Sequence, residues 1–317
     1  MCEHGDVREA MLGICGRWMN RESIQWGEHV SWGAVLQFGV LNGSSLRRYM
    51  DAFDGCPVVG FDSFRGLPAE APGLLRPEAW RAGAFSATAS DAGVAAARAK
   101  ARVVAAELGG EAAMAQPTSP TSYRAGRVTM VPGYYEHSLT AELARDLLAN
   151  QGPASFIDID SDLYVSAFAA LDWVFAHQLV RVGTVIRYDD WWTLPCAARH
   201  HANARVARSI GVDTGDITSY DGEPRAHFEV AQKHNVTFSC ACGPCNASSR
   251  FFSGGSAGYG LGFNPYFVVE AIGGRPDPGF NVSASSMHAF LRGQNTCKTY
   301  RSRRSFELDW ADAGTAH

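Results

Sequence analysis

The sequence has no long hydrophobic run and no strong excess of charge of either sign. Its 28 Lys and Arg residues nearly balance its 32 Asp and Glu residues, which gives a formal net charge of −4. That balance gives no electrostatic reason to expect nucleic acid as a partner. Because no run of about 18 apolar residues occurs, we expect no membrane span. The acidic residues 1–6 are not followed by a hydrophobic signal core, so we expect a cytoplasmic location.

The sequence also lacks the two clear cysteine pairs of a typical zinc site. Eight cysteines are present, and in a reducing compartment we do not expect them to form disulfides. Three of them, Cys240, Cys242 and Cys245, lie close together, with His234 upstream. We interpret them either as free thiols in a loop or as part of a structural zinc site.

The length of the chain sets its domain organisation. With 317 residues, of which 46% are hydrophobic, it can form one large globular domain or two small ones. Helical spacing of apolar residues predicts a helical segment over residues 1–30. Residues 31–240 are expected to form the main domain, with a lid-like insertion rich in Ala, Gly and Pro at 69–126. Residues 241–317, rich in Gly, Ser and Asn, are expected to form an irregular extension.

Alternating strand and helix patterns in the main domain predict an α/β fold. Residues 34–40 are an apolar run of strand length, residues 46–53 have a helical pattern, and residues 57–61 form a second apolar run that ends at Asp62. This order is typical of a doubly wound, Rossmann-like sheet that is mostly parallel and has helices on both faces. In such sheets, ligands bind at the edge formed by the C-terminal ends of the strands.

Two pairs of carboxylates follow two further strand patterns. Asp160 and Asp162 follow the first pattern, Asp189 and Asp190 follow the second, and residues 165–180 between them have a helical pattern. A strand, a helix and a strand form a βαβ unit with parallel neighbouring strands, so we expect these carboxylates at one edge. Such a cluster favours a hard divalent cation such as Mg²⁺. The alternative interpretation is that each Asp only caps a helix or forms a turn.

The first predicted strand and turn suggest a nucleoside site. Glycine at a strand end, as at Gly39 and Gly43, lets a ligand approach the backbone, and the next helix offers free N–H groups. Asp62 is placed to accept ribose hydroxyls. Residues 39–44 lack the Gly-x-Gly-x-x-Gly pattern, which argues against NAD and FAD and favours a ligand without a pyrophosphate, such as S-adenosylmethionine. Alternatively, both glycines serve only a tight turn.

Several strings in the sequence resemble class I S-adenosylmethionine-dependent methyltransferases of the macrocin O-methyltransferase type. The resemblance covers roughly residues 30–240. It is carried by Phe-Gly-Val-Leu-Asn-Gly-Ser-Ser at 38–45, Val-Gly-Phe-Asp-Ser-Phe-Arg-Gly-Leu-Pro at 59–68, Trp80 with Gly-Ala-Phe at 83–85, Val-Pro-Gly-Tyr-Tyr at 131–135, Ile-Asp-Ser-Asp-Leu-Tyr at 159–164 and Asp-Asp-Trp at 189–191.

The resemblance implies a seven-stranded sheet, with S-adenosylmethionine as methyl donor and Mg²⁺ as a second cofactor. It places the cofactor contacts at the ends of the first four parallel strands, at Phe38, Gly39, Gly43, Ser44, Ser45, Asp62, Ser63, Gly133 and Asp160. It places the metal ligands at Asp160, Asp189 and Asp190. The chain departs from the family pattern at Gln37, where members usually carry an acidic residue.

We therefore expect a Mg²⁺-dependent O-methyltransferase that acts on a hydroxyl of a small molecule, of a sugar or secondary-metabolite type. The acceptor hydroxyl must lose its proton during transfer, and Asp160 and His137 are the candidate bases. The competing hypothesis is a catalytically silent Rossmann-like domain that serves as a binding or interaction module. Neither a nucleic acid nor a membrane is expected as a partner, and a homo-oligomer is left open.

Overall fold

The computed structural model describes residues 33–53, 55–72, 74, 80–88, 93–109, 116–119, 122–190, 222–242 and 266–273. The helical segment expected over residues 1–30 lies outside the described residues, as do Cys245 and most of residues 241–317. The zinc hypothesis therefore remains untested.

The described elements alternate between strands and helices along the chain. The strands are β1 Val35–Phe38, β2 Val58–Asp62, β3 Gln116–Ser119, β4 Ser122–Ala125, β5 Val128–Pro132, β6 Phe156–Ile159, β7 Val185–Tyr188, β8 Val236–Cys242 and β9 Tyr266–Ile272. The helices are α2 Ser44–Ala52, α3 Val94–Gly109, α4 Tyr135–Ser138, α5 Ala141–Gln151, α6 Tyr164–Ala176 and α9 Glu223–His234. The βαβ unit predicted around residues 165–180 is therefore confirmed as β6, α6 and β7.

One mixed sheet organises the described residues, in the strand order β3-β4-β5-β2-β1-β6-β7-β9-β8. Its centre, β5-β2-β1-β6-β7, is parallel throughout. The chain runs from β1 outward on one side through β2 and β5, then returns to pair β6 with β1 and continues to β7. This reversal on either side of β1 is the switch point of a doubly wound sheet. The predicted Rossmann-like α/β fold is confirmed.

Within the part of the chain that the structure describes, the sheet has nine strands where seven were expected. The hairpin of β3 and β4, which extends the sheet beside β5, lies within the 69–126 segment that we expected to be a lid-like insertion. β9 lies within residues 241–317, which we expected to be irregular, and it pairs antiparallel with both β7 and β8. Its run Tyr-Phe-Val-Val buries four consecutive side chains, so the sheet takes in part of the chain beyond residue 240.

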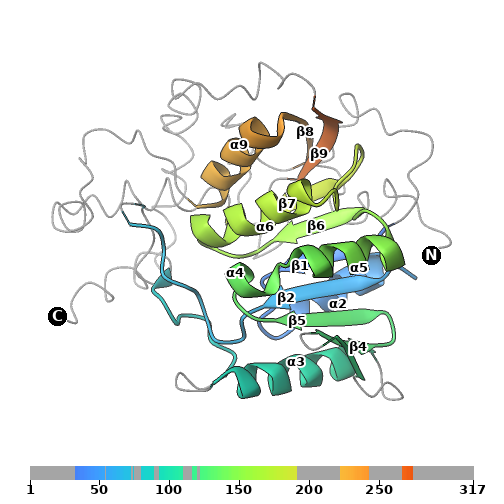
Figure 1. Ribbon diagram of the computed structural model, residues 1–317, viewed down its shortest axis with the longest axis vertical. Helices are drawn as coiled ribbons and strands as arrows, with labels where there is room; N and C mark the ends of the chain where they lie inside the picture. Colours follow the sequence, from blue (N-terminus) through green and yellow to red (C-terminus); the bar gives the residue numbers. More distant parts are fainter. Residues whose placement is uncertain are drawn as a thin grey trace, which may run out of the picture.

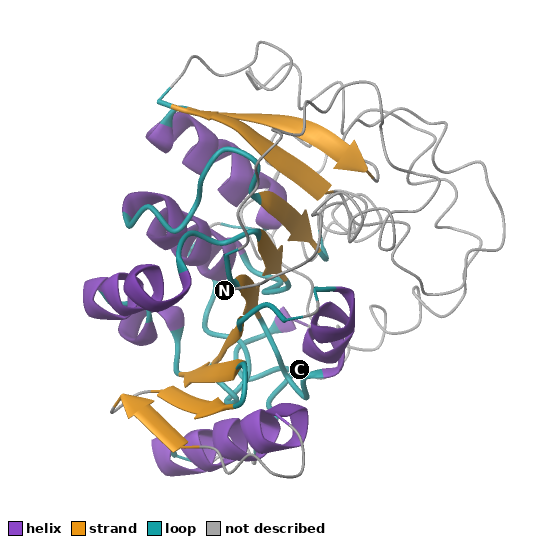
Figure 2. Ribbon diagram, turned by 90° about the vertical axis from the view of Figure 1, so that its right-hand side faces the viewer, coloured by secondary structure: helices purple, strands orange, loops and turns teal. Residues whose placement is uncertain are grey.

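Helices cover both faces of the sheet. One face packs against α5, α6 and α9, and the opposite face packs against α2 and α3. In Figure 1, α5 and α6 lie in front of the strands, and the turned view of Figure 2 shows helices on either side of them. Because both faces are covered, the central strands β1, β6 and β7 are buried at every position, without alternation between buried and exposed side chains.

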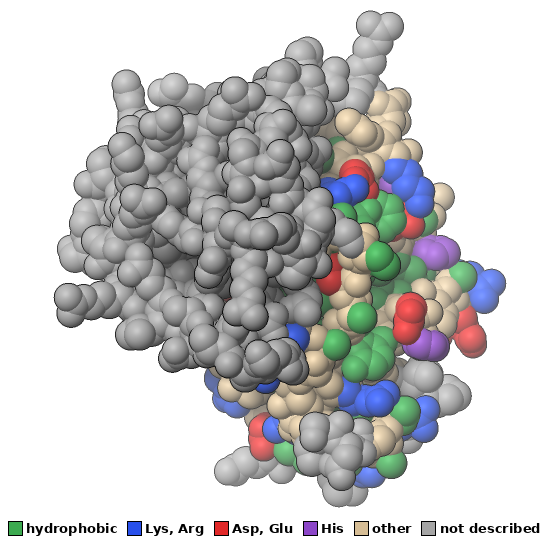
Figure 3. Space-filling view, turned by 90° about the vertical axis from the view of Figure 1, so that its left-hand side faces the viewer, with side chains coloured by type: hydrophobic (Ala, Val, Ile, Leu, Met, Phe, Trp, Pro, Cys, Tyr) green, Lys and Arg blue, Asp and Glu red, His purple; other side chains and the backbone are tan. Residues whose placement is uncertain are grey.

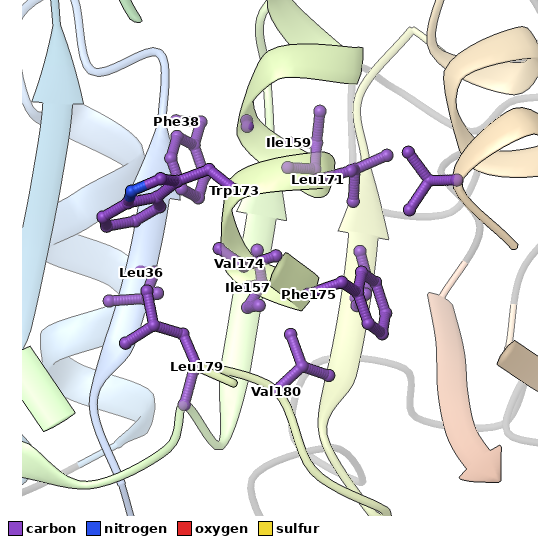
Figure 4. Packing of buried hydrophobic residues seen from close by; sticks show 14 of the residues in the cluster. Leu36, Phe38, Ile157, Ile159, Leu171, Trp173, Val174, Phe175, Leu179 and Val180 are labelled. Atoms are coloured by element: carbon purple, nitrogen blue, oxygen red, sulfur yellow. The ribbon is translucent and has the colours of Figure 1, made fainter. Parts of the chain in front are cut away.

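Aromatic rings fill the core between β1, β2 and α6. Phe38 stacks on Phe61 with ring centroids 4.5 Å apart, and Trp173 of α6 meets both rings edge-on. Figure 4 shows Trp173 beside Phe38, with Val174 and Phe175 following on the same helix. The apolar side chains of α6 therefore pack on the strands that end at the predicted site.

The opposite face of the sheet contains a buried polar row. Gln37 of β1 pairs in register with Asp158 of β6, which pairs with Arg187 of β7, which pairs with Tyr266 of β9. Gln37, Asp158 and Tyr266 are fully buried and Arg187 nearly so. The row lies one residue inside the strand ends, directly below the edge where ligands bind in this fold.

Cys56, between α2 and β2, differs from the expectation for the cysteines. Its side chain is buried and it is disulfide-bonded, whereas free thiols were expected. Composition could not indicate this, because disulfide formation depends on which Cβ atoms the fold brings together. The nearby guanidinium of Arg127 donates to the carbonyls of Met50, Phe53 and Cys56, which satisfies the C-terminal end of α2.

The exposed surface is mixed in character. In the view of Figure 3, acidic, basic and apolar side chains of the described residues are interspersed, as expected from the near-balance of charge in the sequence. None of the described helices has the length and apolar character that a membrane span requires.

Candidate functional site

The five parallel strands end side by side at one edge of the sheet. Backbone hydrogen bonds of 2.9–3.0 Å join each strand end to the next: Gly133 N–H to Asp62 O, Gly39 N–H to Phe61 O, Asp160 N–H to Phe38 O, and Asp189 N–H to Ile159 O. The loops that carry most of the predicted site residues are therefore contiguous. This edge is where ligands bind in doubly wound sheets.

Gly39 has a structural requirement of its own. Its φ of +90° is unfavourable for other residues, and a Cβ there would lie 1.6 Å from the carbonyl oxygen of Asp160. The glycine thus lets the loop after β1 touch the loop after β6 directly. Gly43 also has a positive φ, of +82°, and is the N-cap residue of α2. The tight-turn interpretation therefore holds for both glycines, whatever ligand they contact.

Asp62 ends β2 and binds the loop after β1. Its Oδ2 accepts hydrogen bonds from the N–H groups of Val40 and Leu41, at 2.8 and 2.7 Å, and its Oδ1 accepts one from Phe64 at 2.6 Å. Burial raises the pKa of Asp62, and these N–H groups counteract that rise. A carboxylate has about four lone-pair positions. Asp62, which is not fully buried, therefore has capacity for a further donor.

Backbone strain is concentrated at this edge. Leu41, Phe64 and Asp162 have φ of +51°, +54° and +61°, in the left-handed region that residues with a side chain rarely adopt. They lie in the loops after β1, β2 and β6, respectively. Strained residues of this kind often mark binding sites, because the surrounding structure must hold them in place.

Carboxylates converge at the ends of β6 and β7 as predicted. Asp160, Asp189 and Asp190 each offer one oxygen, and these three oxygens lie within 4.8 Å of one another. Burial first, and then the neighbouring carboxylates, raise the pKa of Asp160 and of Asp190 well above the usual range. Asp162 also lies near this cluster, because burial first, and then the neighbouring carboxylates of Asp160 and Glu223, raise its pKa well above the usual range. The pKa shifts indicate that the cluster holds more negative charge than its surroundings offset.

Arg187 is the cation built into this region. Its Nη1 lies 2.5 Å from Asp158 Oδ1, and its Nη2 also contacts the carboxylate of Asp189. Asp158 additionally accepts a 2.9 Å hydrogen bond from the hydroxyl of Tyr49. Burial opposes the charge of Arg187, but Asp158, Tyr49 and Asp189 more than offset this and raise its pKa. The guanidinium therefore neutralises Asp158 and fixes one side of Asp189.

Glu223, the first residue of α9, is a fully buried carboxylate that joins the two acidic loops. Its Oε1 accepts the N–H of Ser161 at 3.2 Å, and its Oε2 accepts the N–H of Asp190 at 2.9 Å. Burial and then Asp190 raise its pKa well above the usual range. Sequence reasoning did not connect Glu223 with the acidic loops, because its contacts span 62 and 33 residues.

The start of the 69–126 segment lies against the same edge. Glu70 accepts hydrogen bonds from the N–H groups of Tyr164 and Val165, at 2.8 and 3.2 Å, and so caps α6 from outside the helix. Trp80 packs on Leu163, the residue before α6. This part of the expected lid is therefore attached beside the acidic loop after β6.

Other predicted residues have mainly structural contacts. Phe38 is a core residue with no exposed surface. The hydroxyl of Ser63 donates to Gly66 O at 2.7 Å and accepts from Arg65 N–H at 3.0 Å, which shapes the turn after β2. The imidazole of His137 is 74% exposed and contacts Glu136 at 3.3 Å. Phe38 and Ser63 were predicted as cofactor contacts and His137 as a candidate base. The contacts of the described residues do not bond any of the three side chains to the carboxylates of the acidic cluster.

The remaining cofactor predictions lie at the ends of β1 and β5. The hydroxyl of Ser45 accepts a 2.6 Å hydrogen bond from Gln37 Nε2, and Ser44 N–H donates to Asn42 at the exposed start of α2. Gly133 follows β5 with a φ of +140°. Gln37 Nε2 also donates to Gly39 O at 2.8 Å, while its Oε1 is buried without a hydrogen-bond partner among the described residues.

No family model and no curated protein matches the sequence. Among solved structures, the cofactor-bound Rv0187 from MTB is 16% identical, with 75% of this chain and 73% of that chain covered and a TM-score of 0.34. An O-methyltransferase family protein from Burkholderia thailandensis is 13% identical, with 86% and 55% covered and a TM-score of 0.35. The methyltransferase PaMTH1 of Podospora anserina, bound to SAH, is 10% identical, with 75% and 72% covered and a TM-score of 0.35. Likenesses this weak do not establish a family.

Proposed function

We propose that the protein is an S-adenosylmethionine-dependent methyltransferase that methylates a hydroxyl group of a small molecule, with Mg²⁺ bound by Asp160, Asp189 and Asp190. One observation carries the proposal. Asp62 at the end of β2, which suits a nucleoside, and the carboxylate cluster lie on contiguous loops at one edge of the sheet. Methyl transfer requires a donor and an acceptor to be held side by side, and adjacent sites for each meet that requirement.

The polar groups near Gly39 suit the proposed methyl donor. Asp62 has capacity for a donor such as a ribose hydroxyl. The buried Oε1 of Gln37, which has no partner among the described residues, can accept a hydrogen bond from an ammonium group. S-adenosylmethionine offers both kinds of donor, and it carries no pyrophosphate that would need a phosphate-binding loop.

The donor set of the acidic cluster suits a hard divalent cation. All three ligand atoms are carboxylate oxygens, which Mg²⁺ prefers. Arg187 forms ion pairs with Asp158 and Asp189. Among the hydrogen bonds and ion pairs of the described residues, Asp160, Asp162 and Asp190 have no such bond to a cationic side chain. When bound, the cation would hold an acceptor hydroxyl and lower its pKa.

Asp160 is the residue that we propose to accept the proton of the acceptor hydroxyl. Its carboxylate belongs to the cluster that would hold the cation and the acceptor hydroxyl, which puts an oxygen acceptor beside the proton to be removed. Its backbone contact with Gly39 places it beside the proposed donor loop. The exposed His137, whose imidazole contacts Glu136, is less suited to this role because bulk water surrounds it.

The proposal is tested with Asp190→Asn. We expect methyl transfer from labelled S-adenosylmethionine into a small-molecule extract to fall by about 10²-fold or more, because a metal ligand is lost. We expect the thermal shift produced by S-adenosylhomocysteine to change little, because Asp190 is not among the residues that suit the nucleoside. Asp146→Asn, an exposed change on α5, is the matched control and should leave both measurements unchanged.

Two results would contradict the proposal, and they separate its parts. If S-adenosylhomocysteine does not raise the melting temperature of the wild-type protein, the nucleoside assignment is wrong, and a silent interaction module becomes the better interpretation. If Asp190→Asn transfers methyl groups at the wild-type rate, the metal assignment is wrong while the methyltransferase assignment stands.

A further inference from the structure

We infer that Glu223 is a positioning residue: it ties the loop after β6 to the loop after β7, so that the oxygens of Asp160 and Asp190 converge on one divalent cation. The inference rests on the proposed metal site. It assigns a role to Glu223, which lies on a helix that begins more than 30 residues after Asp190.

The geometry of the two hydrogen bonds supports this role. Each carboxylate oxygen of Glu223 accepts one backbone N–H, one from Ser161 and one from Asp190. Ser161 directly follows the proposed ligand Asp160, and Asp190 is itself a proposed ligand. A single rigid carboxylate therefore sets the separation of the two loops, to the precision of two hydrogen bonds.

Capping of its own helix does not account for Glu223. The N-cap residue of α9 is Gly222, which has no side-chain cap bond, and the two oxygens of Glu223 are directed to other segments of the chain. α9 is fixed independently by its packing on the core through Ala226, Phe228 and Val230. The helix thus provides a stable support from which Glu223 reaches the loops.

A stabilising role alone does not account for Glu223 either. Its carboxylate is fully buried and lies near Asp162, Asp189 and Asp190, which carry charge of the same sign. A buried charge beside like charges is unfavourable for folding unless hydrogen bonds offset the cost of desolvation. Groups that orient metal ligands are commonly hydrogen-bonded carboxylates of this kind. The energetic cost of burying Glu223 has a function if its carboxylate holds the loops after β6 and β7 in place for a ligand.

The test is Glu223→Gln, with Mn²⁺ as a paramagnetic probe of the proposed Mg²⁺ site. The amide has only one oxygen, so one of the two backbone N–H groups would face an NH₂ group and lose its acceptor. We expect the Mn²⁺ dissociation constant, measured by electron paramagnetic resonance titration, to rise by about 10–100-fold. The affinity for S-adenosylhomocysteine should stay within about twofold of wild type, because Asp62 is untouched.

Glu229→Gln is the matched control on the same helix. Glu229 bonds the side chains of Tyr164, at 2.5 Å, and Arg225, at 2.7 Å, rather than the backbone N–H groups of Ser161 and Asp190, so Mn²⁺ binding should be unchanged. Glu223→Met is the second variant, because it removes both acceptors at a similar side-chain length. We expect it to weaken Mn²⁺ binding at least as much as Glu223→Gln, while the affinity for S-adenosylhomocysteine stays within about twofold of wild type, and it also serves if Glu223→Gln does not fold.

The outcomes distinguish this inference from the proposed function. If wild-type protein binds no Mn²⁺, the metal site is wrong and the role of Glu223 fails with it. If wild type binds Mn²⁺ and the Glu223 variants bind it equally well, only the inference fails. If the Glu223 variants lose Mn²⁺ and S-adenosylhomocysteine binding together with a lower melting temperature, Glu223 is a general stability residue and the inference is overturned.

Discussion

Asp158 and Asp160 are two residues apart at the end of the same strand, yet their surroundings are opposite. Asp158 is buried inside the sheet, where Arg187 and the hydroxyl of Tyr49 satisfy its oxygens. Asp160 lies just beyond the strand, where its nearest charged neighbours include Asp189 and Asp190. The first carboxylate is neutralised by the fold, whereas the second is crowded by charge of its own sign.

The difference shows how to separate a structural carboxylate from one held for a ligand. A buried charge with a bonded counter-charge contributes to a unique structure, although it is weak evidence for stability. A group of carboxylates without enough counter-charge is unfavourable in isolation and becomes favourable when a cation binds. In the sequence Ile-Asp-Ile-Asp at 157–160, Asp158 has a bonded counter-charge, and Asp160 is the carboxylate that we propose to be held for a cation.

The largest effect is expected from removing the counter-charge of the structural carboxylate. In Arg187→Met, Asp158 stays buried without its partner, so the free energy of unfolding should fall by about 3–5 kcal/mol. Urea denaturation measures this. Arg145→Met, an exposed change on α5, should alter the value by about 0.5 kcal/mol or less. A loss no larger than that of the control would show that Arg187 does not compensate Asp158.

A smaller effect on stability is expected from the protonation of a buried histidine, His227. His227 contacts the hydroxyl of Tyr188 at 2.7 Å, and burial lowers its pKa to about 3. The unfolded chain therefore binds a proton near pH 6.5 that the folded protein does not bind until about pH 3. Stability is present above pH 6.5 and should fall as the pH drops through this window, by at most about 1.4 kcal/mol per pH unit.

The measurement for His227 is a series of urea denaturation curves between pH 7 and pH 4. The His227→Gln variant has no titrating ring, so its stability should decline less steeply over this range. The same pH dependence in both proteins would show that His227 is protonated in the folded state.

The smallest effect on stability is expected from a carboxylate near the surface, Asp172, which serves as a reference for the two buried groups. Asp172 bonds Lys233 and His234 at 2.7 Å, and the Lys233 side chain is 52% exposed. Despite partial burial, these partners lower the pKa of Asp172. Asp172→Asn should therefore cost only about 0.2–1 kcal/mol, and less at high salt. A loss as large as that of Arg187→Met would mean that burial does not set the scale of these effects.

The central sheet could be predicted from the sequence because its signals are local. Apolar runs with no alternation, a helix between two of them and glycine after the first are visible within short windows, and they gave the parallel core and the convergence of Asp160 with Asp190. The β3–β4 hairpin was missed because its run contains Pro117 and Pro120, which are unfavourable in strands. β9 was missed because glycine-rich sequence precedes it.

The supporting residues of the site could not be predicted. Gln37, Asp158 and Arg187 each occur once within an apolar run, and only strand register reveals that they form one row. Glu223 could not be connected with the site from the sequence, since its hydrogen-bond partners are distant along the chain. Long-range hydrogen bonds of this kind leave no periodic pattern to read.

The contact between Gly39 and the carbonyl of Asp160 also limits how the protein could be re-engineered. The two loops meet through main-chain atoms, with no room for even a methyl group. The backbone contact therefore sets the distance between a group bound at the loop after β1 and a group bound at the loop after β6. Substitution of side chains cannot change this distance. Attempts to change what binds at this edge of the sheet should leave this junction intact and vary the segment anchored by Glu70 instead.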